Sequence, residues 1–340
     1  MRTDIRLALP SKGRLQQPTL EFLARCGFEV KPSATRGYIG SIPALPQLTV
    51  LFQRPRDIIV SVAGGGVDFG ITGFDVIAEA QADEHIYVLH DALGYGKCRL
   101  VLAVPEQWED VQNMHDLRVK ASQMPHPLRV VTKYRYLTQR FLETNGVQPF
   151  ALVDAEGSLE VVPEIGYADV IVDVAETGAT LQQNRLRVPQ GGVILHSQAS
   201  LVANRASLRR PEVMAVAIEL LEYIEAHQRA EGYFMVWANV RGESLESVGR
   251  LITEQTTLGG LQGPTIAPIY PNPTSAAAHP HTRWFAVNVV VGRHHLTEAI
   301  EQLRAIGGSG VVVTPTTYIF EEQPSRVAAL RALHQTLRPA

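Results

Sequence analysis

Short apolar runs alternate with amphipathic stretches through the first two thirds of this 340-residue chain. In chain order, the runs are IRLALP, LTVLFQ, FGITG, CRLVLAVP, LRVVTKY and ADVIVDV. Their length is typical of buried strands and the stretches between them are long enough for helices, so the alternation predicts an α/β fold. One helix is expected from Leu15 to Cys26, because Pro18 lies near its start and Gly27 stands where a C-terminal cap belongs.

The predicted strands indicate where a ligand would bind. Open α/β sheets bind their ligands beyond the carboxyl ends of the strands. The segments that follow the strands are therefore the first candidates for a site, namely Ser11 to Arg14, Thr72 to Asp75, Thr132 to Tyr136 and Asp173 to Thr180.

The pattern changes toward the C-terminus. An extended run from Leu186 to Ala203 is broken by a Gly-Gly pair, and a helix is expected from Pro211 to about Arg229. From Tyr233 the expected order is strand, helix, strand, strand, helix, strand, which is the βαββαβ order of ferredoxin-like domains. We therefore predict a small separate domain here, whose last strand runs from Ser309 to Phe320, followed by a polar helix after Phe320.

Composition excludes several classes of protein. The hydrophobic content of 45% and the chain length allow a large core and two or three domains. A net charge of −3 and the lack of any apolar run near about 18 residues argue against nucleic-acid and membrane partners. Cys26 and Cys98 are the only cysteines, and the first residues lack the pattern of a secretory signal. These features predict a cytoplasmic protein without a disulfide framework.

The segment VDVAETGATLQQN, from Val172 to Asn184, combines acids with a turn suited to an anion. It reads as a buried strand that ends in Asp173 and Glu176, then the small-residue turn Thr177-Gly178-Ala179-Thr180, then a helix. Unpaired N–H groups at a helix start, with small side chains around them, let a phosphate approach closely. A threonine cap and a tight glycine turn are the alternative reading. Acids beside a phosphate favour a Mg²⁺ ion or a sugar diol as their partner.

Cations collect in the other strand-end turns of this net-negative chain. They are Lys12, Arg14, Arg54, Lys97, Arg99 and Lys133, with Arg56 and Arg135 close by in sequence. Local concentrations of positive charge in an acidic protein indicate small anionic substrates.

Three other motifs carry no predicted chemistry. The Gly64-Gly65-Gly66 run is expected to close a helix, since no helix follows it. His279, His281, His294 and His295 lack the cysteine or carboxylate spacing of a metal site and are expected to be solvated. No nucleophile elbow or Cys-His pair is present, which argues against covalent catalysis.

Several segments together resemble the ATP phosphoribosyltransferase family, which catalyses the first step of histidine biosynthesis. They are LALPSKGRL, VDFGITGFDVI, GYGKCRLVLAVP, GSLEVVPEIGYADVIVDVAETGATLQQNRL and GPTIAPI. The similarity extends from residue 6 to about residue 319, and its most specific part runs from Gly157 to Leu186. The C-terminal ferredoxin-like unit makes the chain similar to the long form of the family.

This resemblance implies a fold and a domain order. The catalytic core would consist of two α/β domains like those of periplasmic binding proteins, followed by a ferredoxin-like, ACT-like regulatory domain. The implied limits are residues 1–95 with 190–228 for the first catalytic domain, 96–189 for the second, 229–322 for the regulatory domain and 323–340 for a tail.

The resemblance also implies a reaction and roles for the predicted residues. Phosphoribosyl diphosphate and ATP would be the substrates, joined through N1 of the adenine with release of pyrophosphate and a requirement for Mg²⁺. Thr177, Gly178, Ala179 and Thr180 would hold the 5-phosphate and Asp173 the ribose hydroxyls, and Glu176 would also contact phosphoribosyl diphosphate. Glu160 and Arg54 would join Asp173 in catalysis, with Glu160 or Asp173 as candidate Mg²⁺ ligands beside the substrate. The implied ATP-binding residues are Lys12, Gly13, Arg14, Tyr95, Gly96 and Arg99.

Regulation and assembly follow from the same resemblance. L-Histidine would act as a feedback inhibitor that binds near Gly263, Pro264, Thr265 and Ile266, and the chain would form a homo-oligomer, from dimer to hexamer. The chain departs from the family pattern in three places. Arg135 stands where a proline is usual, the 271–283 connection is longer, and the tail from Glu321 is additional.

A non-catalytic binding or sensor protein for a phosphorylated ligand is the alternative function. Such a protein could share the two-domain fold, because fold alone does not decide activity. The presence of both carboxylates together with the complete Thr-Gly-Ala-Thr turn favours catalysis.

Overall fold

The computed structural model describes residues 4–33, 37–154, 166–270 and 283–337. The chain forms two compact units. The first comprises the chain up to Leu221 together with the C-terminal segment from Ser325, and the second runs from Glu222 to Pro324. No helix in the described part of the chain is both long and apolar enough to span a membrane.

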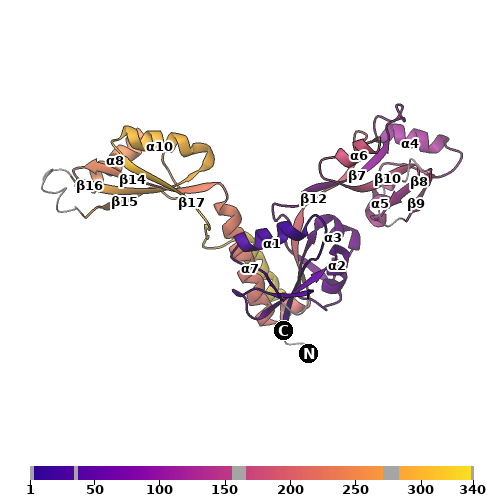
Figure 1. Cartoon of the computed structure of the whole chain (residues 1–340), viewed down its shortest axis with the longest axis horizontal. Helices are drawn as coiled ribbons and strands as arrows, with labels where there is room; N and C mark the ends of the chain where they lie inside the picture. The colour runs from indigo at the N-terminus through magenta and orange to yellow at the C-terminus, as the bar shows by residue number, and fades with distance from the viewer. Residues whose placement is uncertain (1–3, 34–36, 155–165, 271–282, 338–340) are drawn as a thin grey trace. The chain divides into compact units, whose positions relative to one another are not determined.

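The first unit begins with a seven-stranded sheet in the order β2-β3-β4-β1-β5-β13-β6. Its strands are β1 (Ile5–Pro10), β2 (Lys31–Pro32), β3 (Ile39–Ser41), β4 (Leu48–Gln53), β5 (Phe69–Gly73), β6 (Ile86–His90) and β13 (Ala199–Asn204). Strands β4, β1 and β5 are parallel, whereas β13 runs antiparallel between β5 and β6. The helices of this sheet are α1 (Gln16–Arg25), α2 (Pro55–Ala63) and α3 (Phe74–Ala80) (Figure 1). Helix α2 ends at Gly64, as predicted.

A second sheet in the same unit has the order β11-β7-β10-β8-β9, with β12 also paired to β7. Its strands are β7 (Cys98–Pro105), β8 (Leu128–Thr132), β9 (Phe150–Val153), β10 (Val170–Ala175), β11 (Leu186–Arg187) and β12 (Val193–Ser197). Its helices are α4 (Met114–Gln123), α5 (Arg135–Thr144) and α6 (Ala179–Gln183). Leu100, Leu102, Val130 and Val170 are fully buried beneath them, because successive apolar strands pack against amphipathic helices.

The chain passes between these two sheets twice. It leaves the first sheet between β6 and β7 and returns between β12 and β13. Two α/β sheets with this double connection are the arrangement of a core like that of periplasmic binding proteins, which confirms the predicted fold class.

The first stretch of the first unit ends at Leu221, within a helix that continues into the second unit. Helix α7 (Pro211–Ala230) confirms the predicted helix, and it is preceded by the short η2 (Ser207–Arg209). The C-terminal helix α11 (Ser325–Leu337) packs on β6 and η2, with Val327 and Leu330 buried. The predicted tail helix is therefore part of the packed first unit.

The second unit is a four-stranded sheet in the order β15-β16-β14-β17, which confirms the ferredoxin-like topology. Its elements are β14 (Tyr233–Gly242), α8 (Leu245–Gln255), β15 (Thr265–Pro268), β16 (Arg283–Gly292), η3 (Arg293–His295), α10 (Leu296–Ala305) and β17 (Ser309–Pro315). Both α8 and α10 lie on one side of the sheet (Figure 1), where Val236, Ala238 and Val240 are buried. The prediction that the last strand reaches Phe320 is wrong, since β17 ends at Pro315, which lacks a backbone N–H for further pairing.

Candidate active site

The turn that follows β10 is open to solvent. Strand β10 contains the buried Val172 and, next to it, the half-buried Asp173, whose Oδ1 accepts a hydrogen bond of 2.8 Å from the N–H of Val174. Gly178 has φ +84°, and a Cβ built on it would meet no atom within 4 Å. Free space and a left-handed glycine let a ligand come close to this backbone. The predicted order of strand, turn and helix is confirmed, although α6 has only five residues.

The side chains of this turn leave room for a ligand. Glu176, Thr177 and Thr180 are exposed, and Thr177 Oγ1 accepts a hydrogen bond of 3.3 Å from the N–H of Ala179. On the neighbouring strand, Arg99 lies opposite Ala175 in the antiparallel register. A cation is therefore positioned at the strand end where the acids and the turn meet.

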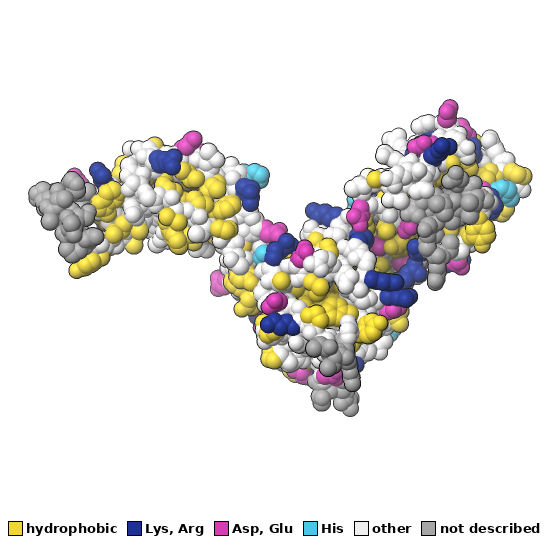
Figure 2. Space-filling model, in the orientation of Figure 1, with side chains coloured by type: hydrophobic (Ala, Val, Ile, Leu, Met, Phe, Trp, Pro, Cys, Tyr) yellow, Lys and Arg dark blue, Asp and Glu magenta, His cyan; other side chains and the backbone are white. Residues whose placement is uncertain are grey.

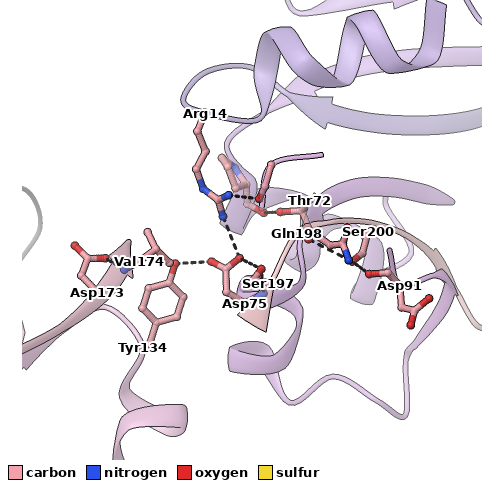
Figure 3. A network of polar contacts seen from close by, with 12 residues as sticks. Arg14, Thr72, Asp75, Asp91, Tyr134, Asp173, Val174, Ser197, Gln198 and Ser200 are labelled. Atoms are coloured by element: carbon pink, nitrogen blue, oxygen red, sulfur yellow. Dashed lines mark hydrogen bonds and ion pairs between the residues drawn. The ribbon is translucent and has the colours of Figure 1, made fainter. Parts of the chain in front are cut away.

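A buried carboxylate joins the strand-end segments from both sheets (Figure 3). Asp75, in the first turn of α3, is only 1% exposed. Its oxygens accept hydrogen bonds from Tyr134 Oη at 2.6 Å and Ser197 Oγ at 2.6 Å, and Arg14 Nη2 lies 3.3 Å away. Three donors around one carboxylate satisfy its buried charge. Asp75 and Tyr134 lie within the strand-end segments predicted as candidates for a site, but neither was assigned a role in it.

Arg14 is fixed by a second contact. Its Nη1 donates a hydrogen bond of 2.5 Å to the carbonyl oxygen of Gly96, in the segment that crosses to the second sheet. Gly96 has φ +62°, and a Cβ there would lie 2.2 Å from the Leu15 side chain, so a glycine is required. The predicted residues Arg14 and Gly96 are thus brought together.

Tyr134 keeps its proton in this environment. Burial raises the pKa of the Tyr134 phenol, and the neighbouring Asp75 charge raises it further. Asp173 adds to the same rise, which means that Tyr134 lies within electrostatic reach of the β10 turn. Tyr134 therefore remains a hydrogen-bond donor to Asp75 throughout the neutral range.

We expect Tyr134→Phe to lower the free energy of unfolding by about 1.5–3 kcal/mol, the usual value of a hydrogen bond to a charged group. The folded protein has the higher Tyr134 pKa, so this stability is present below the unfolded pKa of about 10 and is lost as pH rises above it. Chemical denaturation at neutral and alkaline pH measures both effects. An equal alkaline loss in the wild type and Tyr134→Phe would contradict the assignment.

The other predicted residues of the first unit occupy varied surroundings. Lys12, Gly13 and Arg54 are exposed, and Arg54 directly precedes α2. Tyr95 is turned toward α1, where its hydroxyl donates a hydrogen bond of 3.0 Å to Thr19 Oγ1 and burial raises its pKa. Glu160 lies outside the described residues. The ligand roles of all these residues stay predictions.

The predicted histidine-binding residues lie in the second unit beside a hollow of about 380 Å³. Gly263 and Thr265 line it together with Met235 and Asn288 of the sheet. Ile266 instead packs against the buried side of the sheet.

The described part of the chain offers few clustered side chains that could serve as metal ligands. Within residues 4–33, 37–154, 166–270 and 283–337, no group of three or more His, Cys, Asp and Glu side chains could hold a metal ion. Asp173 nonetheless has the hard oxygen donors that Mg²⁺ prefers, and Mg²⁺ commonly uses one or two carboxylates plus phosphates and water. The described residues therefore fit an ion carried by a phosphorylated substrate.

Comparison with known proteins decides the family. A model of the ATP phosphoribosyltransferase family matches residues 54–225, and the C-terminal domain of the same family matches residues 230–318. The chain belongs to the ATP phosphoribosyltransferase family. Its activity is accordingly the transfer of a phosphoribosyl group from phosphoribosyl diphosphate to N1 of ATP, the first step of histidine biosynthesis. The non-catalytic alternative is not favoured.

Two curated relatives extend along most of the chain. ATP phosphoribosyltransferase 2, chloroplastic, of Arabidopsis thaliana is 41% identical over 338 residues, which cover 97% of this chain and 80% of the relative. The ATP phosphoribosyltransferase of Gemmatimonas aurantiaca is 36% identical, covering 91% of this chain and 97% of the relative. A solved structure, the ATP phosphoribosyl transferase (HisG:HisZ) complex from Thermotoga maritima, is 26% identical with a TM-score of 0.51, covering 65% of this chain and 98% of the other.

Proposed function

We propose that the turn after β10 binds the 5-phosphate of phosphoribosyl diphosphate and that Asp173 binds the ribose hydroxyls. The observation that carries this proposal is the pairing of a half-buried carboxylate with an exposed, glycine-opened turn five residues later. Thr177, Gly178, Ala179 and Thr180 would surround the phosphate with hydroxyl and N–H donors, and Glu176 would contact the same substrate. The diol of the ribose explains why acids adjoin a phosphate site.

Four of the cations at the strand ends would bind the remaining phosphates, namely Lys12, Arg14, Arg54 and Arg99. Loss of pyrophosphate leaves positive charge on the ribose and negative charge on the leaving group. We assign Arg54 to the leaving group, and Lys12, Gly13, Arg14, Tyr95, Gly96 and Arg99 to ATP. Catalysis then requires alignment of N1 and neutralisation of the leaving group, and no strong general base. Glu160, outside the described residues, would support the ribose.

Asp75 would act by positioning Arg14. Because Arg14 is held between the Asp75 carboxylate and the Gly96 carbonyl, its guanidinium enters the site in a fixed orientation. A preorganised cation stabilises developing negative charge without reorganisation during the reaction.

Magnesium would enter with the substrate. Asp173, and Glu160 as the second candidate, would contact an ion that is otherwise held by pyrophosphate oxygens and water. The ion would supply charge neutralisation on the departing pyrophosphate.

Feedback inhibition by L-histidine is proposed for the hollow beside Gly263 and Thr265. The regulated form of the protein would be a hexamer assembled from dimers. The cytoplasmic location stays a prediction from the sequence.

The first experiment measures pyrophosphate release with ATP, phosphoribosyl diphosphate and Mg²⁺, with detection of the N1-ribosylated nucleotide. We expect product only when both substrates and free Mg²⁺ are present, and a lower rate with millimolar L-histidine. Chelation of Mg²⁺ with excess EDTA should stop the reaction, and added Mg²⁺ should restore it. Full activity in EDTA would contradict the metal assignment, and a rate unaffected by L-histidine would contradict the regulatory assignment.

A further inference from the structure

Three cations that the proposed catalytic site does not use surround a second hollow in the first unit. Arg56, Lys133 and Arg135 line a space of about 290 Å³ together with residues of α2 and α3. This volume is just below the range of about 300–1,000 Å³ that is usual for ligand sites.

The floor of the hollow is apolar. It is formed by Ile59 and Val60 of α2 and by Val76 and Ala80 of α3, with Tyr134 alongside. Val76 and Ala80 are four positions apart and share one face of α3, whereas the adjacent Ile59 and Val60 point in different directions, with Ile59 buried and Val60 exposed. Val60 is 71% exposed, so an apolar surface in a concave position is left to solvent.

The rim carries an excess of positive charge. Lys133 is half-buried, and no acid among the described residues pairs with its ammonium group. Arg56 donates a hydrogen bond to the Lys133 carbonyl and lies 6.0 Å from the centre of the Tyr134 ring. Figure 2 shows Lys and Arg side chains gathered beside apolar surface on the first unit.

The acids near this rim are already engaged. Glu79 accepts hydrogen bonds from the backbone N–H groups of Tyr136 at 2.9 Å and Leu137 at 3.0 Å, at the start of α5. Asp154 pairs with Arg135 at 2.7 Å. Arg56 and Lys133 are therefore the charges that an incoming ligand would meet.

We propose that this hollow is a binding site for a small organic anion with an apolar body, such as an aromatic carboxylate. The apolar part would cover Val60 and Val76 and lie against Tyr134, and the anionic group would pair with Lys133 and Arg56. A triphosphate is a poor match, because the floor offers it few polar partners. Helices α2 and α3 belong to the first sheet and α5 to the second, so the anion stabilises the arrangement in which these segments meet.

The test uses phenylacetate and its neutral counterpart phenylacetamide with the full-length protein. Binding is measured by saturation-transfer NMR, with ATP and phosphoribosyl diphosphate absent or saturating. We expect phenylacetate to bind at least about tenfold more tightly than the amide, as loss of a charge-assisted contact predicts. Phenylacetate should remain bound when both substrates saturate the enzyme.

Two variants locate the site. Val60→Asp places a negative charge on the apolar floor, and Lys133→Gln removes the rim ammonium while keeping the side-chain length. Each should weaken phenylacetate binding by about tenfold or more. Val119→Asp, at another exposed valine on α4, is the matched control and should bind as the wild type does. Wild-type binding by Val60→Asp, equal binding of the amide, or competitive displacement by ATP would each overturn the proposal.

Discussion

Asp173→Asn lowers kcat/KM for phosphoribosyl diphosphate by about 10²- to 10⁴-fold, because two ribose hydroxyls lose a charged acceptor and such bonds are worth about 1.5–3 kcal/mol each. The fold should be retained, since the Asn side-chain oxygen can still accept the Val174 N–H hydrogen bond. Steady-state kinetics with varied phosphoribosyl diphosphate, together with circular dichroism, measure the two outcomes.

Asp110→Asn is the matched control for this prediction. Asp110 is exposed and pairs with Lys120 at 2.8 Å, away from the strand ends that form the site. Surface ion pairs contribute about 0–1 kcal/mol to stability, so this variant should keep wild-type kinetics. Unchanged kinetics in Asp173→Asn would remove Asp173 from the mechanism, whereas an equal loss in Asp110→Asn would indicate a general effect of charge removal.

Removal of the second unit should abolish inhibition by L-histidine. The effect of this removal on stability depends on whether α11 is also removed. A variant that ends at Gly232 loses α11 with the regulatory sheet. A second variant replaces Tyr233–Pro324 by a long flexible linker and keeps α11. Burial of a Val or Leu side chain is worth about 1.5–3 kcal/mol, so loss of Val327 and Leu330 should destabilise the shorter variant by roughly 3–6 kcal/mol relative to the second.

The two deletions separate regulation from stability. Both should retain pyrophosphate release without a response to L-histidine, whereas thermal unfolding should occur at a lower temperature in the variant without α11. Equal unfolding temperatures would mean that the α11 contacts add nothing to the first unit. Inhibition that survives in the linker variant would place the histidine site outside the second unit.

Local features made most of the fold predictable. The apolar runs predicted β1, β4, β5, β7, β8 and β10, because buried strands in this fold are short continuous apolar segments. Gly27 and Gly64 ended α1 and α2 as expected, since helix termination depends on a few neighbouring residues. The turn at Gly178 was predictable for the same reason.

The Asp75 network was not predictable because its partners are distant in sequence. Tyr134 and Arg14 are separated from Asp75 by 59 and 61 positions, and Ser197 by 122. The apolar runs place Arg14, Asp75 and Tyr134 at strand ends. Nothing local in the sequence indicates that these strand ends meet around one carboxylate. An aspartate two positions after a fully buried strand was the available signal.

The sequence only weakly indicates that α11 packs on the first unit. Val327 and Leu330 are three positions apart and thus share one face of α11. This spacing predicts an apolar stripe, but it does not identify β6 and η2 as the surface that receives the stripe.

The position of β13 has a consequence for how this protein is synthesised. In the first sheet, β6 is joined to β5 only through β13, which follows β6 by more than a hundred residues in the chain. While the nascent chain emerges, the edge of β5 stays unpaired until residues 199–204 have been translated, and such edges favour association with other chains. A slow stretch of translation before β13 should therefore increase aggregation, whereas one after α11 should have little effect.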